Sequence, residues 1–398
     1  MILKIEKLDH FGRGISKDGK NIYFVENALV GETVKVKVIK NKKNIFECKV
    51  DKILEKSSDR IESACPYYEL CGGCQLLHIP YLKQLEFKEN KVKEIIAKFS
   101  HLDTSLIKDI VPCDNQFFYR NKIVLKCDHK LGFYKEKSKD VVLIDKCLLA
   151  DEKINEIINV LNKYKNIGEV TIRKSKNTDD LMVSFSKNID SSLKSEILKK
   201  VSCVYEANKA VKNESIKEIL NDKVFEISNK SFFQINTSQA IKLYDLVKEG
   251  LSLKREDVVL DLYCGTGTIG IYLSDYVDKV IGVELVDSSI KNAKKNALLN
   301  NCKNINFVLG DVKNEIKNLL VKPSKIVVDP PRAGLDKDTI NYLNDSMANI
   351  IVYVSCDPVT LARDLELLIN YDVLSVTPLD MFPNTYHVET CTILCRKK

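Results

Sequence analysis

The spacing of hydrophobic and polar residues divides the chain into regions with different rhythms. Up to about residue 56, apolar and polar residues alternate in short runs such as "TVKVKVIK" and "NIFECKVDKIL", separated by turns such as "KDGK". Alternation with a period of two is typical of strands that bury one face. We therefore expect residues 1–56 to form a small β-barrel.

Residues 57–235 show a mixed pattern, and the rhythm changes again near residue 236. Helical periodicity predicts helices over residues 81–99 and near 151–164, and "NKIVLKC" and "KLGFY" read as strands. From 236 onward, near-continuous apolar strands alternate with helical segments, which indicates a parallel sheet covered by helices on both faces. The last two strands, "VLSVTPL" and "HVETCTILC", predict an antiparallel hairpin. The fold class is therefore α/β, with domains at residues 1–56, 57–235 and 236–398.

Composition narrows the class of protein without deciding its function. Hydrophobic residues make up 44% of the chain and charged residues 29%, which is the balance of a globular protein. No apolar run reaches the ~18 residues of a membrane span, and the first residues lack the apolar core of a signal peptide. We expect a cytoplasmic protein with no membrane partner. The net charge of +7 is compatible with nucleic acid but also with ordinary lysine-rich solubility.

A glycine-rich loop follows the first strand of the last region. In "VVLDLYCGTGTIGIYL", Gly265, Gly267 and Gly270 have the G-x-G-x-x-G spacing, and Glu284 ends the next strand. Glycines allow a tight turn and close approach of the backbone to a ligand, and the acid suits ribose hydroxyls. This pattern predicts an adenosine-containing cofactor and leaves its identity open.

Cys356 stands where the buried strand "IIVYVSC" ends and a polar turn begins. Ligands of doubly wound sheets bind at the carboxyl ends of the strands, so Cys356 should lie near the cofactor and near Asp329 in "VVDPPRAGL". The segment "DLYCGTG" resembles the first motif of S-adenosylmethionine-dependent methyltransferases. In such an enzyme, a thiolate at Cys356 could attack carbon 6 of a uracil and make carbon 5 nucleophilic enough to accept a methyl group. A base must then remove the proton on carbon 5, and Glu389 in "NTYHVET" is our candidate.

A second group of cysteines lies in the segment "CPYYELCGGCQLLH". Thirteen cysteines in a chain of 398 residues without signs of secretion favour metal binding or catalysis over a disulfide framework. Cys65, Cys71 and Cys74 have a C-x5-C-x2-C spacing, and Cys147 is a plausible fourth ligand. Four thiolates fit either an iron–sulfur cluster or structural zinc.

Five ordered motifs carry a resemblance to a known family: "SFFQIN", "DLYCGTGTIG", "VVDPPRAGLD", "YVSCDPVTLARDL" and "NTYHVET". Together they resemble the RNA uracil-5 methyltransferases. The resemblance implies a Rossmann-like, seven-stranded S-adenosylmethionine methyltransferase domain, preceded by an OB-like TRAM barrel and a central mixed α+β iron–sulfur domain. It further implies that Cys356 is the nucleophile and Glu389 the base.

The same resemblance assigns the remaining ligands. The residues implied to contact S-adenosylmethionine are Gln234, Tyr263, Gly265, Gly267, Glu284, Asp311 and Asp329. Relatives with the cysteine motif carry a [4Fe-4S] cluster, here expected on Cys65, Cys71, Cys74 and Cys147. The barrel and cysteine motif together are more similar to the bacterial enzymes that modify 23S ribosomal RNA, while some cluster-bearing relatives modify transfer RNA.

Three other interpretations remain open at this stage. An exocyclic amine methyltransferase would fit Asp329-Pro330-Pro331, but an aromatic residue is usual where Arg332 stands, and Cys356 would be idle. An NAD-dependent oxidoreductase has only the glycine spacing in its favour. A non-catalytic RNA-binding ribosome assembly factor could use the same scaffold. The presence of both Cys356 and Glu389 argues against this non-catalytic interpretation.

Overall fold

The computed structural model describes residues 1–127, 129–135, 138–319 and 321–398. Contacts between residues divide the chain into two compact units. The first unit comprises Met1–Lys91, Gly132–Ile144 and Phe382–Tyr386. The second unit comprises Val92–Leu131, Asp145–Met381 and His387–Lys398. The domain boundaries predicted above stay predictions.

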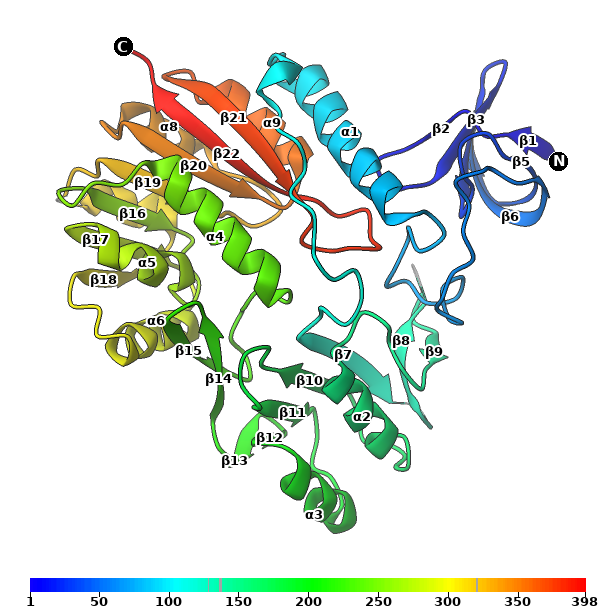
Figure 1. The fold of residues 1–398 in the computed structure, drawn as a ribbon, viewed down its shortest axis with the longest axis horizontal. Coiled ribbons are helices and arrows are strands. Elements are labelled where there is room, and N and C mark those ends of the chain that lie inside the picture. The colour runs from blue at the N-terminus through cyan, green and yellow to red at the C-terminus, as the bar shows by residue number, and fades with distance from the viewer. Residues whose placement is uncertain (128, 136–137, 320) are drawn as a thin grey trace. The chain divides into compact units, whose positions relative to one another are not determined.

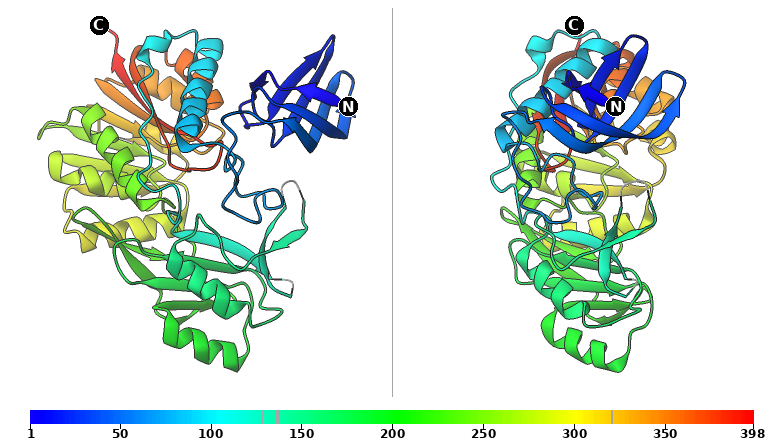
Figure 2. Two further views of the ribbon diagram at one scale, coloured as in Figure 1. Left: turned by 45° about the vertical axis from the view of Figure 1, so that its right-hand side comes forward. Right: turned by 90° about the vertical axis from the view of Figure 1, so that its right-hand side faces the viewer.

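The amino-terminal part of the first unit is a curled six-stranded sheet, with strand order β1-β5-β6-β4-β3-β2 (Figure 2). Its strands are β1 (Ile2–Lys4), β2 (Lys7–Leu8), β3 (Gly14–Asp18), β4 (Asn21–Glu26), β5 (Thr33–Lys42) and β6 (Ile45–Glu55). The predicted alternation is present in β5. Val34 and Val36 are buried, whereas Lys35 and Lys37, which follow them in turn, are exposed. The barrel core is therefore built by every second residue, as the pleat of a strand requires.

The first unit also contains the hairpin of β8 (Leu131–Tyr134) and β9 (Val141–Leu143). Helix α1 (Tyr81–Phe99) has the bounds expected from the sequence. Its residues up to Lys91 belong to the first unit, and those from Val92 belong to the second.

The central part of the second unit is a mixed sheet in which β13, β12, β11, β10 and β7 are neighbours in that order. These strands are β7 (Lys122–Cys127), β10 (Val170–Lys174), β11 (Leu181–Phe185), β12 (Cys203–Glu206) and β13 (Lys209–Lys212). Helices α2 (Glu152–Leu161) and α3 (Ser191–Lys200) and the hairpin of β14 (Ser215–Leu220) and β15 (Lys223–Ser228) complete it. The helix expected near 151–164 thus begins at the N-cap Asp151 but ends earlier, at Leu161.

Within the described ranges, seven strands form the sheet of the carboxyl-terminal part, in the order β18-β17-β16-β19-β20-β22-β21 (Figure 1). They are β16 (Val258–Leu262), β17 (Lys279–Glu284), β18 (Ile305–Leu309), β19 (Lys325–Val328), β20 (Ile350–Ser355), β21 (Tyr371–Leu379) and β22 (Glu389–Arg396). The strands from β16 to β20 pair in parallel, whereas β22 inserts antiparallel between β20 and β21. The predicted hairpin is present.

Helices cover both faces of this sheet, so the expectation of an α/β fold is confirmed. Helix α4 (Thr237–Leu251) crosses one face (Figure 1), where Gly250 allows close packing because a Cβ there would come 2.9 Å from Ile393. The remaining helices of this part are α5 (Thr268–Leu273), α6 (Asp287–Leu299), α7 (Val312–Glu315), α8 (Lys337–Asp345) and α9 (Pro358–Leu367). On the opposite face, α8, α9 and the second half of α1 share one apolar core with the strands.

Candidate active site

The site lies at the edge of the sheet where its parallel strands end. Residue pairing aligns Leu262 of β16 with Val328 of β19, and Val328 with Tyr353 of β20. Asp329 follows directly after β19, and its N–H donates to the carbonyl of Leu262 at 3.3 Å. The loops after these strands therefore gather at one edge, as expected for a parallel sheet with ligands at its carboxyl end.

The antiparallel strand β22 brings Glu389 to this edge from the far end of the chain. Ser355, the last residue of β20, pairs with Thr390, whose hydroxyl donates to the Ser355 carbonyl at 3.2 Å. Glu389 precedes Thr390, and Cys356 follows Ser355. Because antiparallel partners run in opposite directions, Cys356 and Glu389 are the next pair beyond the ladder.

Burial and neighbouring charge control the protonation of the Cys356 thiol. Burial, followed by the negative charges of Glu389, Asp329 and Asp357, raises the pKa of Cys356 to about 11, against the opposing effect of Arg332. The thiol is therefore protonated at neutral pH. It would become a thiolate when a substrate or the positive charge of a cofactor offsets these carboxylates.

The Glu389 carboxyl is almost fully buried, with 6% of its surface exposed. Burial and the charge of Asp329 raise the pKa of Glu389 to about 8, while Arg332 opposes the shift. Burial also raises the pKa of Asp329 to about 7. A carboxyl group whose pKa is close to the working pH can both accept and release a proton, as general acid–base catalysis requires.

The loop between β16 and α5 is held open by residues in the left-handed backbone region. Tyr263 has φ +64°, Gly265 φ +54° and Gly267 φ +76°. A Cβ on Gly267 would come 2.7 Å from the Phe307 ring, whereas a Cβ on Gly265 would meet nothing within 4 Å. Gly267 therefore serves packing, and Gly265 faces open space, which suits close approach of a ligand.

The Glu284 carboxylate, at the end of β17, is fixed beside this loop. One oxygen accepts from the N–H of Gly265 at 3.1 Å and the other from the N–H of Val286 at 2.8 Å. The N–H of Gly310 donates to the Glu284 carbonyl at 3.0 Å, which brings the next residue, Asp311, to the same edge. Of the three predicted cofactor carboxylates, Glu284 thus borders the glycine loop, and Asp311 follows the residue bonded to the Glu284 backbone.

The segment that contains Gln234 is also attached to the loop. The Thr266 hydroxyl donates to the carbonyl of Phe232 at 3.4 Å. The side chain of Asn121, at the start of the central sheet, donates to the Gln234 carbonyl at 2.9 Å. The predicted residues of the catalytic and cofactor sets therefore come from seven separate stretches of the chain.

Sequence reasoning missed the buried polar residues that hold the Gln234 segment. The amide of Asn121 also donates to the Thr237 hydroxyl at 3.1 Å, and that hydroxyl donates to Glu218 at 3.2 Å. Asn121 and Glu218 are 3% and 1% exposed. Nothing local in the sequence distinguishes them from surface residues, because their partners lie elsewhere along the chain.

The cysteine motif does not form a metal site in the part of the chain that the structure describes. Cys65, Cys71 and Cys74 are each partly exposed on a loop of the first unit, and Cys147 belongs to the second unit. Among the described residues, no group of three or more His, Cys, Asp or Glu side chains is arranged to hold a metal ion. The iron–sulfur cluster is therefore not shown and stays a prediction from the sequence.

Among the helices of the described residues, none combines the length and apolar character that crossing a membrane requires.

Fold and site define a class, the α/β methyltransferases, and similarity to known proteins defines the family. The profile of the family "tRNA (Uracil-5-)-methyltransferase" matches residues 163–397, and that of the TRAM domain matches residues 2–50. The chain belongs to the RNA uracil-5 methyltransferase family, and its amino-terminal barrel is a TRAM domain. Both expectations from the sequence are confirmed.

Similar proteins match the chain over nearly its whole length. An uncharacterized RNA methyltransferase of Clostridium acetobutylicum is 36% identical, covering 98% of this chain and 96% of its own. One of Staphylococcus epidermidis is 33% identical, covering 99% and 97%. The crystal structure of Pyrococcus abyssi tRNA (uracil-54, C5)-methyltransferase in complex with S-adenosyl-L-homocysteine is 28% identical, with a TM-score of 0.82, and covers 99% and 100%.

Proposed function

We propose that the protein methylates carbon 5 of a uridine in RNA, with S-adenosylmethionine as methyl donor and Cys356 as covalent catalyst. The observation that carries this proposal is the strand pairing that makes Cys356 and Glu389 neighbours at the ligand-binding edge of the sheet. An exocyclic amine methyltransferase or an oxidoreductase would have no use for that pair.

S-adenosylmethionine, when bound, supplies a methyl group on a positively charged sulfur. The Cys356 thiolate attacks carbon 6 of the uracil, and the carbon–sulfur bond turns carbon 5 into a nucleophile. Once carbon 5 carries the methyl group, Glu389 removes the proton from that carbon. The electron pair of the broken C–H bond restores the double bond and expels the Cys356 thiolate.

The raised pKa of Glu389 fits this role. A carboxylate with a pKa of about 8 is a stronger base than an ordinary glutamate, so it removes a carbon-bound proton more readily. Asp329 and Arg332 lie within electrostatic reach of both catalytic groups, since their charges shift the pKa values of Cys356 and Glu389.

The proposed cofactor contacts divide between backbone and carboxylates. Gly265 leaves the loop backbone open to the ligand, Gly267 supports the loop by packing against Phe307, and Glu284 would bind the ribose hydroxyls. Tyr263, Gln234, Asp311 and Asp329 border the same space and would bind the rest of the cofactor. The Glu284 oxygen now held by the Gly265 N–H would keep that bond while the second oxygen turns to the ribose.

The proposed RNA substrate is 23S ribosomal RNA, on the combined presence of the TRAM domain and the cysteine motif. A specific observation favours transfer RNA as the second candidate. The Pyrococcus abyssi enzyme, which acts on tRNA uracil-54, matches 99% of this chain. Domain organisation alone therefore does not separate the two substrates.

We further propose a [4Fe-4S] cluster on Cys65, Cys71, Cys74 and Cys147, supported by the C-x5-C-x2-C spacing. No step of the reaction uses it. Protein purified without oxygen should contain iron and acid-labile sulfide in equal amounts, and a Cys71→Ser, Cys74→Ser double variant should lose both. Metal-free protein with full RNA affinity would remove the cluster from the proposal.

Covalent trapping tests the reaction. RNA containing 5-fluorouridine, offered with S-adenosylmethionine as 23S fragments and as tRNA transcripts in parallel, should stall as a covalent complex, because fluorine cannot leave as a proton does. Cys356→Ser should form none. An adduct on tRNA alone would establish the second candidate, and no adduct from protein that binds the cofactor would end the covalent proposal.

A further inference from the structure

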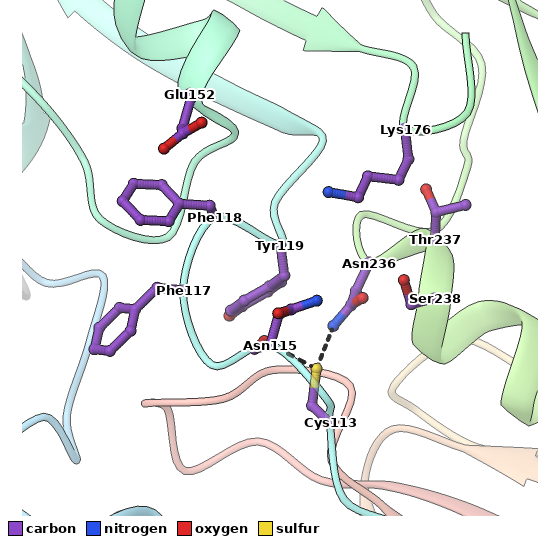
Figure 3. A pocket seen from close by; sticks show the side chains of 10 residues that line it. All are labelled: Cys113, Asn115, Phe117, Phe118, Tyr119, Glu152, Lys176, Asn236, Thr237 and Ser238. Atoms are coloured by element: carbon purple, nitrogen blue, oxygen red, sulfur yellow. Dashed lines mark hydrogen bonds between the residues drawn. The ribbon is translucent and has the colours of Figure 1, made fainter.

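A cavity of about 220 Å³ lies in the second unit, and neither Cys356 nor Glu389 lines it (Figure 3). It is lined by Cys113, Asn115, Phe117, Phe118, Tyr119, Glu152, Lys176, Asn236, Thr237 and Ser238. This volume is below the ~300 Å³ at which pockets for drug-sized ligands begin. It has room for one planar ring system and not for a whole nucleotide cofactor.

The walls of the cavity are fixed by hydrogen bonds between distant segments. The amide of Asn236 donates to the sulfur of Cys113 at 3.4 Å, and the Cys113 thiol donates to the carbonyl of Asn115 at 3.1 Å (Figure 3). Behind the opposite wall, buried Glu218 accepts from the N–H of Lys176 at 2.7 Å and from the hydroxyl of Thr237 at 3.2 Å. The cavity is therefore built in advance of any ligand.

An aromatic run, Phe117, Phe118 and Tyr119, supplies the apolar lining. Phe118 has φ +55°, a conformation that costs a bulky residue energy, and its side chain is nevertheless 37% exposed. The N–H of Phe118 donates to the carbonyl of Leu148 at 2.8 Å, which holds the strained backbone in place. Strain that keeps an aromatic ring at the surface is typical of a binding site.

The polar groups at the cavity offer both donors and acceptors. The ammonium of Lys176 points toward the aromatic run, and the Glu152 carboxylate lies beside the Phe118 ring (Figure 3). Within the described part of the chain, neither of these two charged groups makes an ion pair. A phosphate would face the negative Glu152, whereas a neutral base could accept from Lys176 and donate to Glu152.

We propose that this cavity binds one unstacked base of the substrate RNA, between the Phe118 ring and the polar groups of Lys176 and Glu152. Single-stranded bases are recognised by stacking on aromatic side chains and by hydrogen bonds to their edges. Each of the four bases presents both an acceptor and an N–H donor on its edges, so the cavity would bind an unstacked base without selecting one of the four.

The location of the cavity connects it to the reaction. Asn236, Thr237 and Ser238 follow two to four residues after Gln234, on the same segment that borders the cofactor loop. A base held there would anchor the RNA beside the segment from which the target uridine is presented. This inference rests on the proposed function, because it takes RNA as the ligand.

The test compares Phe118→Ala, Phe118→Trp and the control Tyr276→Ala, which removes an aromatic side chain that is 45% exposed outside the cavity. Dissociation constants are measured for 23S fragments, for tRNA transcripts and separately for S-adenosylmethionine, with thermal unfolding to check each fold. Phe118→Ala should weaken RNA binding by about 10- to 100-fold, since a stacked base contributes that much. Phe118→Trp and Tyr276→Ala should bind like the wild type.

The outcomes are distinct. Unchanged RNA affinity in folded Phe118→Ala overturns the inference. A loss of S-adenosylmethionine affinity as large as the loss of RNA affinity also overturns it, because the cavity would then only support the Gln234 segment. If Phe118→Ala does not fold, Lys176→Ala gives the same reading from the opposite side of the cavity. Binding is measured without turnover, so wild-type protein that binds RNA through Phe118 but methylates none would refute only the proposed function.

Discussion

Gly265 and Gly267 lie two residues apart in the same loop and should respond very differently to alanine. Both have positive φ, so each substitution forces an L-residue into the left-handed region, at a cost of about 1–2 kcal/mol. A methyl group on Gly267 would in addition lie 2.7 Å from the Phe307 ring and 3.0 Å from the Ala293 Cβ. Overpacking of this kind costs about 1–3 kcal/mol, whereas a methyl group on Gly265 would meet no atom within 4 Å.

We therefore expect Gly267→Ala to destabilise the sheet by about 2–5 kcal/mol and Gly265→Ala by about 1–2 kcal/mol. Replacing glycine by alanine also lowers the conformational entropy of the unfolded chain. This effect is equal in the two variants and cancels when they are compared. Hydrogen–deuterium exchange of peptides from β16 and β17 measures this local free energy without assuming that the whole chain unfolds in one step.

The two variants should also separate stability from ligand binding. Gly265→Ala places its methyl group in the open space proposed for the cofactor. We therefore expect a larger loss in the free energy of S-adenosylmethionine binding than in the free energy of unfolding. Phe307→Leu, added to Gly267→Ala, should recover part of the lost stability by removing the ring. Equal exchange rates in the two single variants, or no recovery in the double variant, would refute the packing argument.

Three further predictions follow from the site and its surroundings. Glu389→Gln should lower methylation by about 10²–10⁴-fold while enzyme–RNA adducts accumulate on denaturing gels, and full turnover would exclude it as the base. Because the pKa of Cys356 is about 11 in the protein without ligands, the rate at which iodoacetamide alkylates this thiol, measured against Cys356→Ser, should rise about tenfold per pH unit between pH 7 and 9; a flat profile would contradict the raised pKa. Asp364 is fully buried and accepts hydrogen bonds from the Tyr353 hydroxyl at 2.7 Å and from the Leu335 N–H at 2.8 Å. Asp364→Ala should therefore lower the stability measured by thermal unfolding by about 3–5 kcal/mol. The matched control, Asp364→Asn, should lose less, and an equal loss would contradict this reasoning.

The folded-state pKa of Glu389 also predicts a stability difference with a definite sign. Its folded pKa is raised to about 8 from 4.5, so the fold favours the protonated form. The stabilising effect of that proton is complete below pH 4.5 and is lost as the pH rises to 8. Glu389→Gln, which stays neutral, should therefore gain stability relative to the wild type across this window, by at most about 1.4 kcal/mol per pH unit. A constant difference from pH 5 to 8 would contradict the raised pKa.

Local sequence signals were sufficient for many of the elements and for the family. The bounds of α1, the alternation of β5, the closing hairpin and the glycine loop all follow from periodicity or from turn residues, which act over fewer than about ten positions. Cys356 could be placed at a strand end, and the family could be named from ordered motifs. These features depend on the chain's own neighbours, so the sequence determines them.

The tertiary structure decided which of these residues meet. β22 could have paired at either side of β21, and only its insertion beside β20 makes Glu389 the neighbour of Cys356. The buried contact of Asn121 with Thr237 joins residues 116 positions apart in the sequence, and that of Glu218 with Thr237 joins residues 19 positions apart. The cavity at Phe118 likewise brings together distant segments of the chain. Such contacts depend on how loops close and how buried polar groups find partners, and no local pattern encodes that choice.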